Sequence, residues 1–207
     1  EQYKAQREET PEAIRLSVPI IKEIIRAYRI PILEVAGYEA DDVIGTLATE
    51  AGRQGIITYM MTPDKDYGQL VSDKVFMYRP KHTGGFEVMG VDEVKAKFDI
   101  QSPAQVIDML GLMGDSSDNI PGCPGVGEKT AQKLIAEFGS IENLLEHTDQ
   151  LKGALKTKVE TNREMITFSK FLATIKIDVP IQLDMDSLVR EQACLLYTSD
   201  AADERSS

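Results

Sequence analysis

A short apolar run with acidic residues directly after it most constrains the fold of this chain. The residues IITYMM (56–61) are apolar without a break over the length of one strand, as in a parallel strand that is buried in a sheet. Further strand-like runs are PILEV (31–35), KVFMYR (74–79) and FEVMG (86–90), the last two joined by a turn at Gly84 and Gly85. Because strands alternate with helical segments, we predict an α/β protein with a layered sheet.

Helical periodicity explains much of the remaining chain. We expect a helix over residues 10–28, with Thr10 as N-cap, Pro11 at the first helical position, and a kink or a split at Pro19. A second helix follows the acidic residues of GYEADDVIGTLA (37–48) and should stop at Gly52 or Gly55.

After about residue 90 the pattern becomes helical throughout. We expect helices in VDEVKAKF, PAQVIDMLGLMG, EKTAQKLIAEFG and SIENLLEHT, the last with Ser140 as its N-cap, and one long helix over about 152–175. The chain is therefore predicted to hold an α/β half followed by a helical half.

Composition limits the class of protein. The chain has 207 residues, of which 42% are hydrophobic, enough for a real core, and it has no apolar run long enough to span a membrane. The two cysteines, Cys123 and Cys194, are too few for a disulfide framework, so we expect a reducing compartment such as the cytoplasm. The first residue is Glu1 rather than Met, so we expect a fragment, and a targeting segment could be missing.

Carboxylates gather in three places along the chain. Each group also has a local explanation: acidic residues suit the first turn of a helix, Pro-Asp often marks a polar turn, and aspartates cap Asx turns. The second group follows the carboxyl end of the run 56–61, where ligands bind in open α/β sheets. The three groups comprise Glu39, Asp41 and Asp42, then Asp64 and Asp66, then Asp115 and Asp118.

Seven converging carboxylates could not all ionise without cations. Hard divalent ions prefer oxygen ligands, so Mg²⁺ or Mn²⁺ is expected, and zinc is not, because His82 and His147 are far apart and form no cluster with cysteines. A group of this size could hold two ions about 4 Å apart, the arrangement that hydrolyses phosphodiesters.

The net charge of −11 argues against a general nucleic-acid binder. Without the seven proposed ligands, however, the charge is −4, and without the last fourteen residues it is about −2. Bound metal ions would add positive charge, so a DNA partner is allowed.

A glycine-rich segment, NIPGCPGVGEKTAQKLI (119–135), follows the third acidic group. Small residues at a helix start let a phosphate backbone approach the free N–H groups, and Lys129 and Lys133 can share a face. The simpler alternative is a glycine-rich connection between helices. A nucleotide-binding P-loop is rejected, because Glu128 separates Gly127 from Lys129 and a helix precedes the loop.

The last fourteen residues, CLLYTSDAADERSS (194–207), fit none of these patterns. They resemble the translation of a sequencing adapter, so we expect a non-native tail; the alternative is an ordinary disordered C-terminus.

The motifs GYEADDVIGTLA, TPDKDYGQLV, GLMGDSSDNIPG and GVGEKTAQKLI together resemble the 5′-nuclease (5′→3′ exonuclease) domain of bacterial DNA polymerase I, in the flap endonuclease superfamily. The resemblance covers about residues 1–185. It implies a PIN-like (Rossmann-like) three-layer α/β core over 1–100 and a helix-hairpin-helix-type, SAM-like helical subdomain over 101–190. It also implies a monomeric, bacterial, nucleoid-associated protein without a membrane anchor that acts on 5′ ends and flaps of DNA in primer removal and repair.

The resemblance also assigns residues. It implies that all seven carboxylates bind metal, Asp42 either directly or through water, with Asp115 and Asp118 completing a second metal site. It implies that Lys4 and Arg7 in QYKAQREE contact the scissile phosphate; the alternative is a frayed, solvated N-terminus. Duplex DNA would bind the segment 119–133, where main-chain carbonyls could hold K⁺. The residues expected to bind DNA are Gly122, Gly125, Gly127, Lys129, Thr130 and Lys133.

The chain departs from the family at its start. The family begins with a strand that carries an essential aspartate, and a second aspartate precedes the arch; both would lie upstream of Glu1, as would the first strand of the sheet. Two other functions therefore stay open. One is a catalytically impaired DNA-binding fragment of the same domain, and the other is a Mg²⁺-dependent phosphohydrolase of small molecules, which would not need a backbone-binding module.

Overall fold

The computed structural model describes residue 4 and residues 9–81 and 83–191. Its contacts divide the chain into two units. The first unit holds Lys4 and residues 38–179, and the second holds residues 9–37 and 180–191. The expected tail at 194–207 lies outside the described residues.

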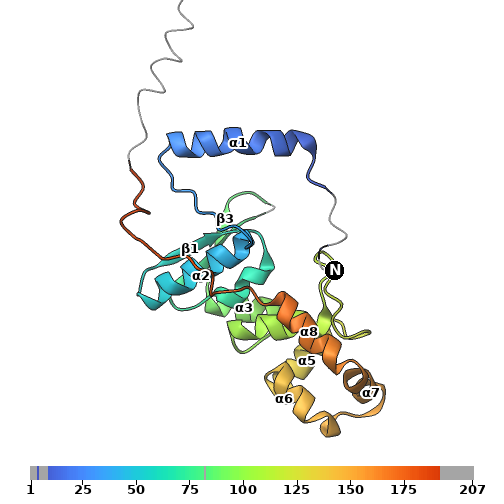
Figure 1. Cartoon of the computed structure of the whole chain (residues 1–207). Helices are drawn as coiled ribbons and strands as arrows, with labels where there is room; N and C mark the ends of the chain where they lie inside the picture. The colour runs from blue at the N-terminus through green and yellow to red at the C-terminus, as the bar shows by residue number, and fades with distance from the viewer. Residues whose placement is uncertain (1–3, 5–8, 82, 192–207) are drawn as a thin grey trace, which may run out of the picture. The chain divides into compact units, whose positions relative to one another are not determined.

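A small mixed sheet forms the α/β part of the first unit (Figure 1). Its three strands, in the order β1-β2-β3, are β1 (Thr58–Met61), β2 (Val75–Pro80) and β3 (Phe86–Met89). β1 runs parallel to β2, with Met60 opposite Met77, and β3 returns antiparallel, with Met77 opposite Met89. The parallel strand expected at 56–61 is therefore confirmed.

One face of this sheet is buried and the other is not. Met60, Val75 and Met77 are buried, whereas Tyr59 and Met61 are 57% and 72% exposed. The expectation that 56–61 is buried throughout was therefore wrong: β1 lies at the edge of the described sheet, and its side chains alternate between the two faces.

Helix α2 (Ala40–Arg53) packs against the buried face of the sheet. The contact is close at Gly52, where a Cβ atom would lie 2.8 Å from a methyl group of Val75. The helix ends one residue after Gly52, and Gly55 follows with a φ of +80°, a conformation that suits glycine after a helix.

The rest of the first unit is helical. Figure 1 shows the strands and α2 at one end of the first unit, and α5, α6 and α7 at its other end. Between α4 and α8 the approach is close at Gly111, where a Cβ atom would lie 3.0 Å from the Cα atom of Lys170. The helices are α3 (Val91–Phe98), α4 (Val106–Met113), α5 (Glu128–Phe138), α6 (Ile141–Glu146), α7 (Gly153–Thr161) and α8 (Arg163–Ala173), with 3₁₀ helices η1 (Lys65–Leu70), η2 (Pro103–Gln105) and η3 (Thr148–Gln150). The fold class is confirmed: an α/β core is followed by a helical subdomain.

The long helix expected over 152–175 is two helices. Asn162 separates α7 from α8 with a φ of −110°, and its side-chain amide donates a 2.8 Å hydrogen bond to the carbonyl oxygen of Lys158. Asparagine favours such local bonds over helix continuation, which explains the break. By contrast, Ser140 caps α6 as expected, its hydroxyl oxygen accepting from the N–H of Asn143.

The second unit corrects two expectations. Its helix α1 (Glu12–Ala27) is a single helix through Pro19, and its N-cap is Pro11 rather than Thr10, without a side-chain cap. No strand forms over 31–35, because burial does not stabilise this segment: none of its side chains is buried, and Leu33 is 41% exposed. In the described part of the chain, no helix is long and apolar enough to cross a membrane.

Candidate functional site

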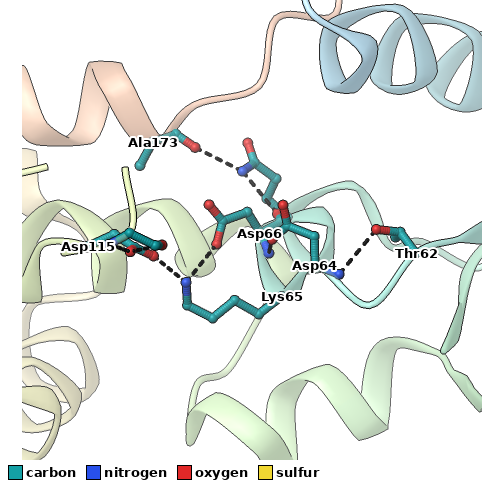
Figure 2. Close-up of polar contacts among 8 residues, drawn as sticks. Thr62, Asp64, Lys65, Asp66, Asp115 and Ala173 are labelled. Atoms are coloured by element: carbon teal, nitrogen blue, oxygen red, sulfur yellow. Dashed lines mark hydrogen bonds and ion pairs between the residues drawn. The ribbon is translucent and has the colours of Figure 1, made fainter. Parts of the chain in front are cut away.

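The second acidic group lies directly after β1. The N–H of Asp64 donates to the hydroxyl of Thr62 at 3.1 Å, and a carboxylate oxygen of Asp64 accepts from the N–H of Asp66 at 3.0 Å (Figure 2). Asp64 therefore caps η1, as the polar-turn interpretation predicts. The same turn places both carboxylates beyond the carboxyl end of a parallel strand.

The first acidic group begins α2. Glu39 is the N-cap, and its N–H donates to a carboxylate oxygen of Asp42 at 3.3 Å. The other oxygen of Asp42 accepts from the N–H of Lys176 at 3.0 Å. Asp41 and Asp42 lie in the first turn, where the helix dipole favours negative charge. The local explanation of this group therefore holds as well.

The third acidic group lies in a tight turn after α4. The N–H and carbonyl groups of Asp115 pair with those of Ile120 at 2.9 and 2.7 Å. An oxygen of the Asp115 carboxylate accepts from the N–H of Ser117 at 2.8 Å, which is an Asx turn. Lys4 reaches the same turn, since its N–H donates to the carbonyl oxygen of Asp118 at 3.1 Å.

Local bonds do not explain why these segments come together. A pocket of about 40 Å³ is lined by carboxylates from all three groups: Glu39, Asp41, Asp42, Asp66 and Asp118. A larger pocket of about 420 Å³ shares Glu39 and Asp41 and adds Asp64, Lys4, Thr62 and Tyr67. We call these two pockets together the acidic site. Six of the seven predicted ligands line it.

Asp115 lines neither pocket but is joined to Asp66 through a lysine. The Lys65 ammonium group donates to Asp66 at 3.2 Å and forms an ion pair with Asp115 (Figure 2). Within the acidic site, the ammonium group of Lys4 pairs with Glu39. Two lysines therefore supply positive charge around the acidic side chains.

The acidic site contains oxygen atoms that suit a divalent ion, but the side chains are not positioned to coordinate one. The donors are all carboxylate oxygens, which suit a hard divalent ion and not a thiophilic one. Among residues 4, 9–81 and 83–191, however, no three acidic, histidine or cysteine side chains are arranged to hold one ion. The carboxylates would have to turn toward a common point, and Glu39, Asp66 and Asp115 now face the lysines instead.

Burial and like charges perturb the carboxyl groups. Burial, with the nearby charges of Asp64 and Asp115, raises the pKa of Asp66 to about 6, although Lys65 opposes the shift. Burial also raises the pKa of Asp41. The pKa of Asp115 shifts in the opposite direction. Burial would raise it, but the hydrogen bonds from Lys65 and Ser117 lower it below the usual value.

The glycine segment forms the turn that the sequence predicts. Gly122 and Gly125 have φ angles of +62° and +75°, and Gly127 is the N-cap of α5, which begins at Glu128. The N–H of Gly122 donates to the buried hydroxyl of Ser169 at 3.0 Å, which fixes the turn against α8. Lys129 and Lys133 are exposed on α5, and Thr130 is half-buried.

Two residues that organise the site were not predicted from the sequence. Lys65 stands between Asp64 and Asp66, and a cation in that position was a signal that could have been used. Gln69 gave no such signal: its amide donates to the carbonyl oxygens of Asp66 and Ala173, both at 3.0 Å, and accepts from Ile175, so it ties η1 to the end of α8. Arg7, which was expected to contact phosphate, lies outside the described residues.

This chain combines an α/β part, with an acidic site at the end of a parallel strand, and a helical part, with a glycine turn that begins a helix. Known proteins share this two-part architecture. The model of the 5′-3′ exonuclease N-terminal resolvase-like domain matches residues 1–99, and that of the 5′-3′ exonuclease C-terminal SAM fold matches residues 101–194. The DNA polymerase I of Bacillus caldotenax is 43% identical over 204 residues, and that of Bacillus subtilis 45% identical over 203. Each alignment covers 95% of this chain but 23% of the relative, so the chain spans less than a quarter of these proteins.

Solved structures share the fold at lower identity. A T5 5′-exonuclease with bound zinc ions has a TM-score of 0.68 at 22% identity, over 83% of this chain and 66% of that one. The catalytic core of Rad2 in complex with DNA substrate has a TM-score of 0.61 at 16% identity, over 95% of this chain and 66% of that one. The chain belongs to the 5′-3′ exonuclease family, a family of nucleases whose two domain models follow one another along it.

Proposed function

We propose that this chain is a divalent-metal-dependent, structure-specific 5′-nuclease that hydrolyses DNA phosphodiesters at 5′ ends and flaps. The observation that carries the proposal is the acidic site, which gathers carboxylates from three segments between residues 39 and 118. The parent protein would be a DNA polymerase I of the bacterial cytoplasm that acts near the nucleoid in primer removal and repair. The division into 1–100 and 101–190 is part of the proposal.

The metal ligands would be the seven carboxylates, with two Mg²⁺ or Mn²⁺ ions between them. The T5 relative is described with divalent ions, which supports this assignment. When bound, such ions would activate water and neutralise charge on the reacting phosphate. The chain itself supplies the acidic oxygens and, through Thr62 and Gln69, the turn that holds Asp64 and Asp66 in place.

Lys4 would bind the scissile phosphate, together with Arg7. Its ammonium group lies at the larger pocket of the acidic site, where it pairs with Glu39. A lysine there can exchange a carboxylate partner for a phosphate oxygen when DNA enters, which is why we assign it to the substrate.

The duplex backbone would bind at the glycine turn. Gly122, Gly125 and Gly127 keep the backbone free of side chains, and the start of α5 offers N–H groups beside Lys129, Thr130 and Lys133. The carbonyl oxygen of Gly125 accepts from the ammonium group of Lys158 at 3.2 Å, so this carbonyl already faces a cation. A K⁺ ion at this turn would use the same kind of oxygen.

The experiment that tests this function separates cutting from binding. Asp64→Ala should abolish Mg²⁺-dependent cutting of a 5′-flap DNA while DNA affinity changes little, because Asp64 would hold metal rather than DNA. The control is Asp92→Ala on α3, whose side chain is 94% exposed and should leave both properties unchanged. Cutting by Asp64→Ala at the wild-type rate would remove the metal-site assignment.

A second candidate is a DNA-binding module without catalysis. One observation favours it: the described residues hold no finished three-ligand arrangement for a metal. This candidate predicts DNA binding without any Mg²⁺-dependent cutting by the wild-type chain, so the same assay separates the two.

A further inference from the structure

The side chain of Lys65 touches two of the three acidic groups, and the proposed function gives it no role. It follows Asp64 in the chain and begins η1. Its ammonium group donates to Asp66 at 3.2 Å and pairs with Asp115, fifty positions away (Figure 2). It thereby joins the turn after β1 to the turn after α4.

This contact differs from an ordinary surface ion pair. The side chains of Asp66 and Asp115 are only 16% and 8% exposed. Lys95 on α3 provides a comparison within the chain: its side chain is 38% exposed, close to the 36% of Lys65, but its partner Asp92 is 94% exposed and 3.9 Å away. Surface pairs of that kind contribute little, whereas charges shielded from water interact strongly.

The oxygens that Lys65 engages are those that a metal would need. One oxygen of Asp115 accepts from Ser117, and the other faces Lys65, so each oxygen of this carboxylate already has a donor within the protein. On the Asp66 side, Lys65 holds one oxygen of a carboxylate that also lines the smaller pocket of the acidic site. An ammonium group and a divalent ion cannot both occupy the same position against these oxygens.

We propose that Lys65 is a built-in counter-ion that holds the two turns together without metal and competes with a divalent ion for Asp66 and Asp115. The inference rests on the proposed metal site and adds a residue that regulates its occupancy. Lys65 acts through the two aspartates, so it is a positioning residue in this role. A metal ion that binds there displaces the ammonium group toward solvent, which its side chain reaches already.

The test compares Lys65→Met with Lys95→Met in the full chain, first in chelator. Lys65→Met leaves Asp66 and Asp115 without their shared cation, so its thermal midpoint should fall by about 2–4 °C, the shift that a loss of ~1 kcal/mol causes in a chain of this size. Lys95→Met should change the midpoint by less than about 1 °C, because it removes an exposed pair. In an Asp115→Asn background, the fall in the thermal midpoint caused by Lys65→Met should be smaller by about half or more, because the side chains of Lys65 and Asp115 are coupled.

The second arm measures Mn²⁺ affinity from the signal of free Mn²⁺ in electron paramagnetic resonance. Lys65→Met should bind Mn²⁺ at least about threefold more tightly than wild type, because a competing positive charge is removed. Lys95→Met should bind it as wild type does. Unchanged or weaker Mn²⁺ binding by Lys65→Met would overturn the competition, and an unchanged midpoint in chelator would overturn the counter-ion role.

The two arms also separate this inference from the proposed function. If the wild-type chain and both variants bind no Mn²⁺, the proposed metal site fails and the competition fails with it. The midpoints in chelator still decide whether Lys65 holds the two turns together.

Discussion

At the scale of single residues, Asp66 combines burial with like-charged neighbours. Its carboxyl group lies beside Asp64 and Asp115, and a pKa of about 6 means that the folded protein resists ionising it. A raised pKa of an acid stabilises the folded state below the unfolded pKa of about 3.8, and this contribution is lost as the pH rises through 6. At pH 8 without metal, the ionised Asp66 therefore destabilises the fold.

Asp66→Asn should consequently raise the stability of the metal-free protein at pH 8. We expect a gain of about 1–2 kcal/mol in the free energy of unfolding, less than the full shift because Lys65 is left without one partner. At about pH 3 the difference should vanish, since Asp66 is then mostly protonated in both the folded and the unfolded state. Urea unfolding in chelator at the two pH values measures it, and an equal or lower stability of Asp66→Asn at pH 8 would contradict the assigned pKa.

At the scale of the elements, the glycine turn depends on one close approach. A Cβ atom on Gly122 would lie 2.3 Å from the backbone nitrogen of Gly114, and its φ of +62° already disfavours other residues. Gly127, five positions on, has a φ of −97°, and a Cβ atom added there would have no atom beyond its neighbours in the chain within 4 Å.

Gly122→Ala should therefore destabilise the protein by about 3 kcal/mol, whereas Gly127→Ala should cost less than about 1 kcal/mol. Both substitutions add one methyl group to the same segment. The difference between their free energies of unfolding, measured by chemical denaturation, therefore reports the cost of the close contact at Gly122. Similar losses in the two variants would show that the turn is not constrained at Gly122.

A buried charge joins three helices of the helical part. Asp108 on α4 is 4% exposed; it accepts from the N–H of Ile141 at 3.0 Å and from Lys170 of α8 at 2.6 Å. Lys170 also pairs with Glu142 of α6 at 2.8 Å. Burial raises the pKa of Asp108, and these bonds oppose the shift.

Lys170→Met should destabilise the protein by about 2–4 kcal/mol, because it leaves a buried carboxylate without its cation. Glu142→Gln should cost less than about 1 kcal/mol, since Glu142 is 63% exposed and water replaces its partner. Equal effects of the two substitutions on the free energy of unfolding would mean that Asp108 is not held by charge.

The elements show which sequence signals were sufficient. Apolar runs and caps predicted β1, α5 and the Ser140 cap, because burial and local bonds determine them together. They failed at PILEV (31–35), which has the composition of a strand but is not buried and forms no strand, and at Asn162, where one local hydrogen bond divides an apparently continuous helix.

At the scale of the whole molecule, local sequence signals likewise predicted one part of the acidic site and missed another. Its carboxylates could be predicted because each group has a local motif, and the end of a parallel strand is a known ligand position. The partners of Gln69 and Lys65 could not be predicted, because Ala173 and Asp115 lie 104 and 50 positions away from them along the chain, respectively. Such pairs depend on tertiary packing, which no local pattern encodes.

The proposed binding of DNA has to be judged for the whole chain, because its net charge of −11 would repel a polyanion and must be offset by positive charge at the binding surface. Replacing Lys129 and Lys133 together with Ala should weaken binding to all duplexes alike and lower the salt dependence by about one unit of slope for each phosphate that is no longer bound. Fluorescence anisotropy over a salt series measures this, with Lys95→Ala as the control. An effect confined to one DNA sequence would contradict backbone binding.

Cleavage of a 5′-end-labelled flap DNA, with Mg²⁺ and with chelator, tests the central claim most directly. We predict a cut near the flap junction in Mg²⁺ and no cut in chelator, because the proposed function requires the carboxylates of the acidic site to act through bound divalent ions. Bound but intact DNA in Mg²⁺, or equal cutting in chelator, would contradict this claim.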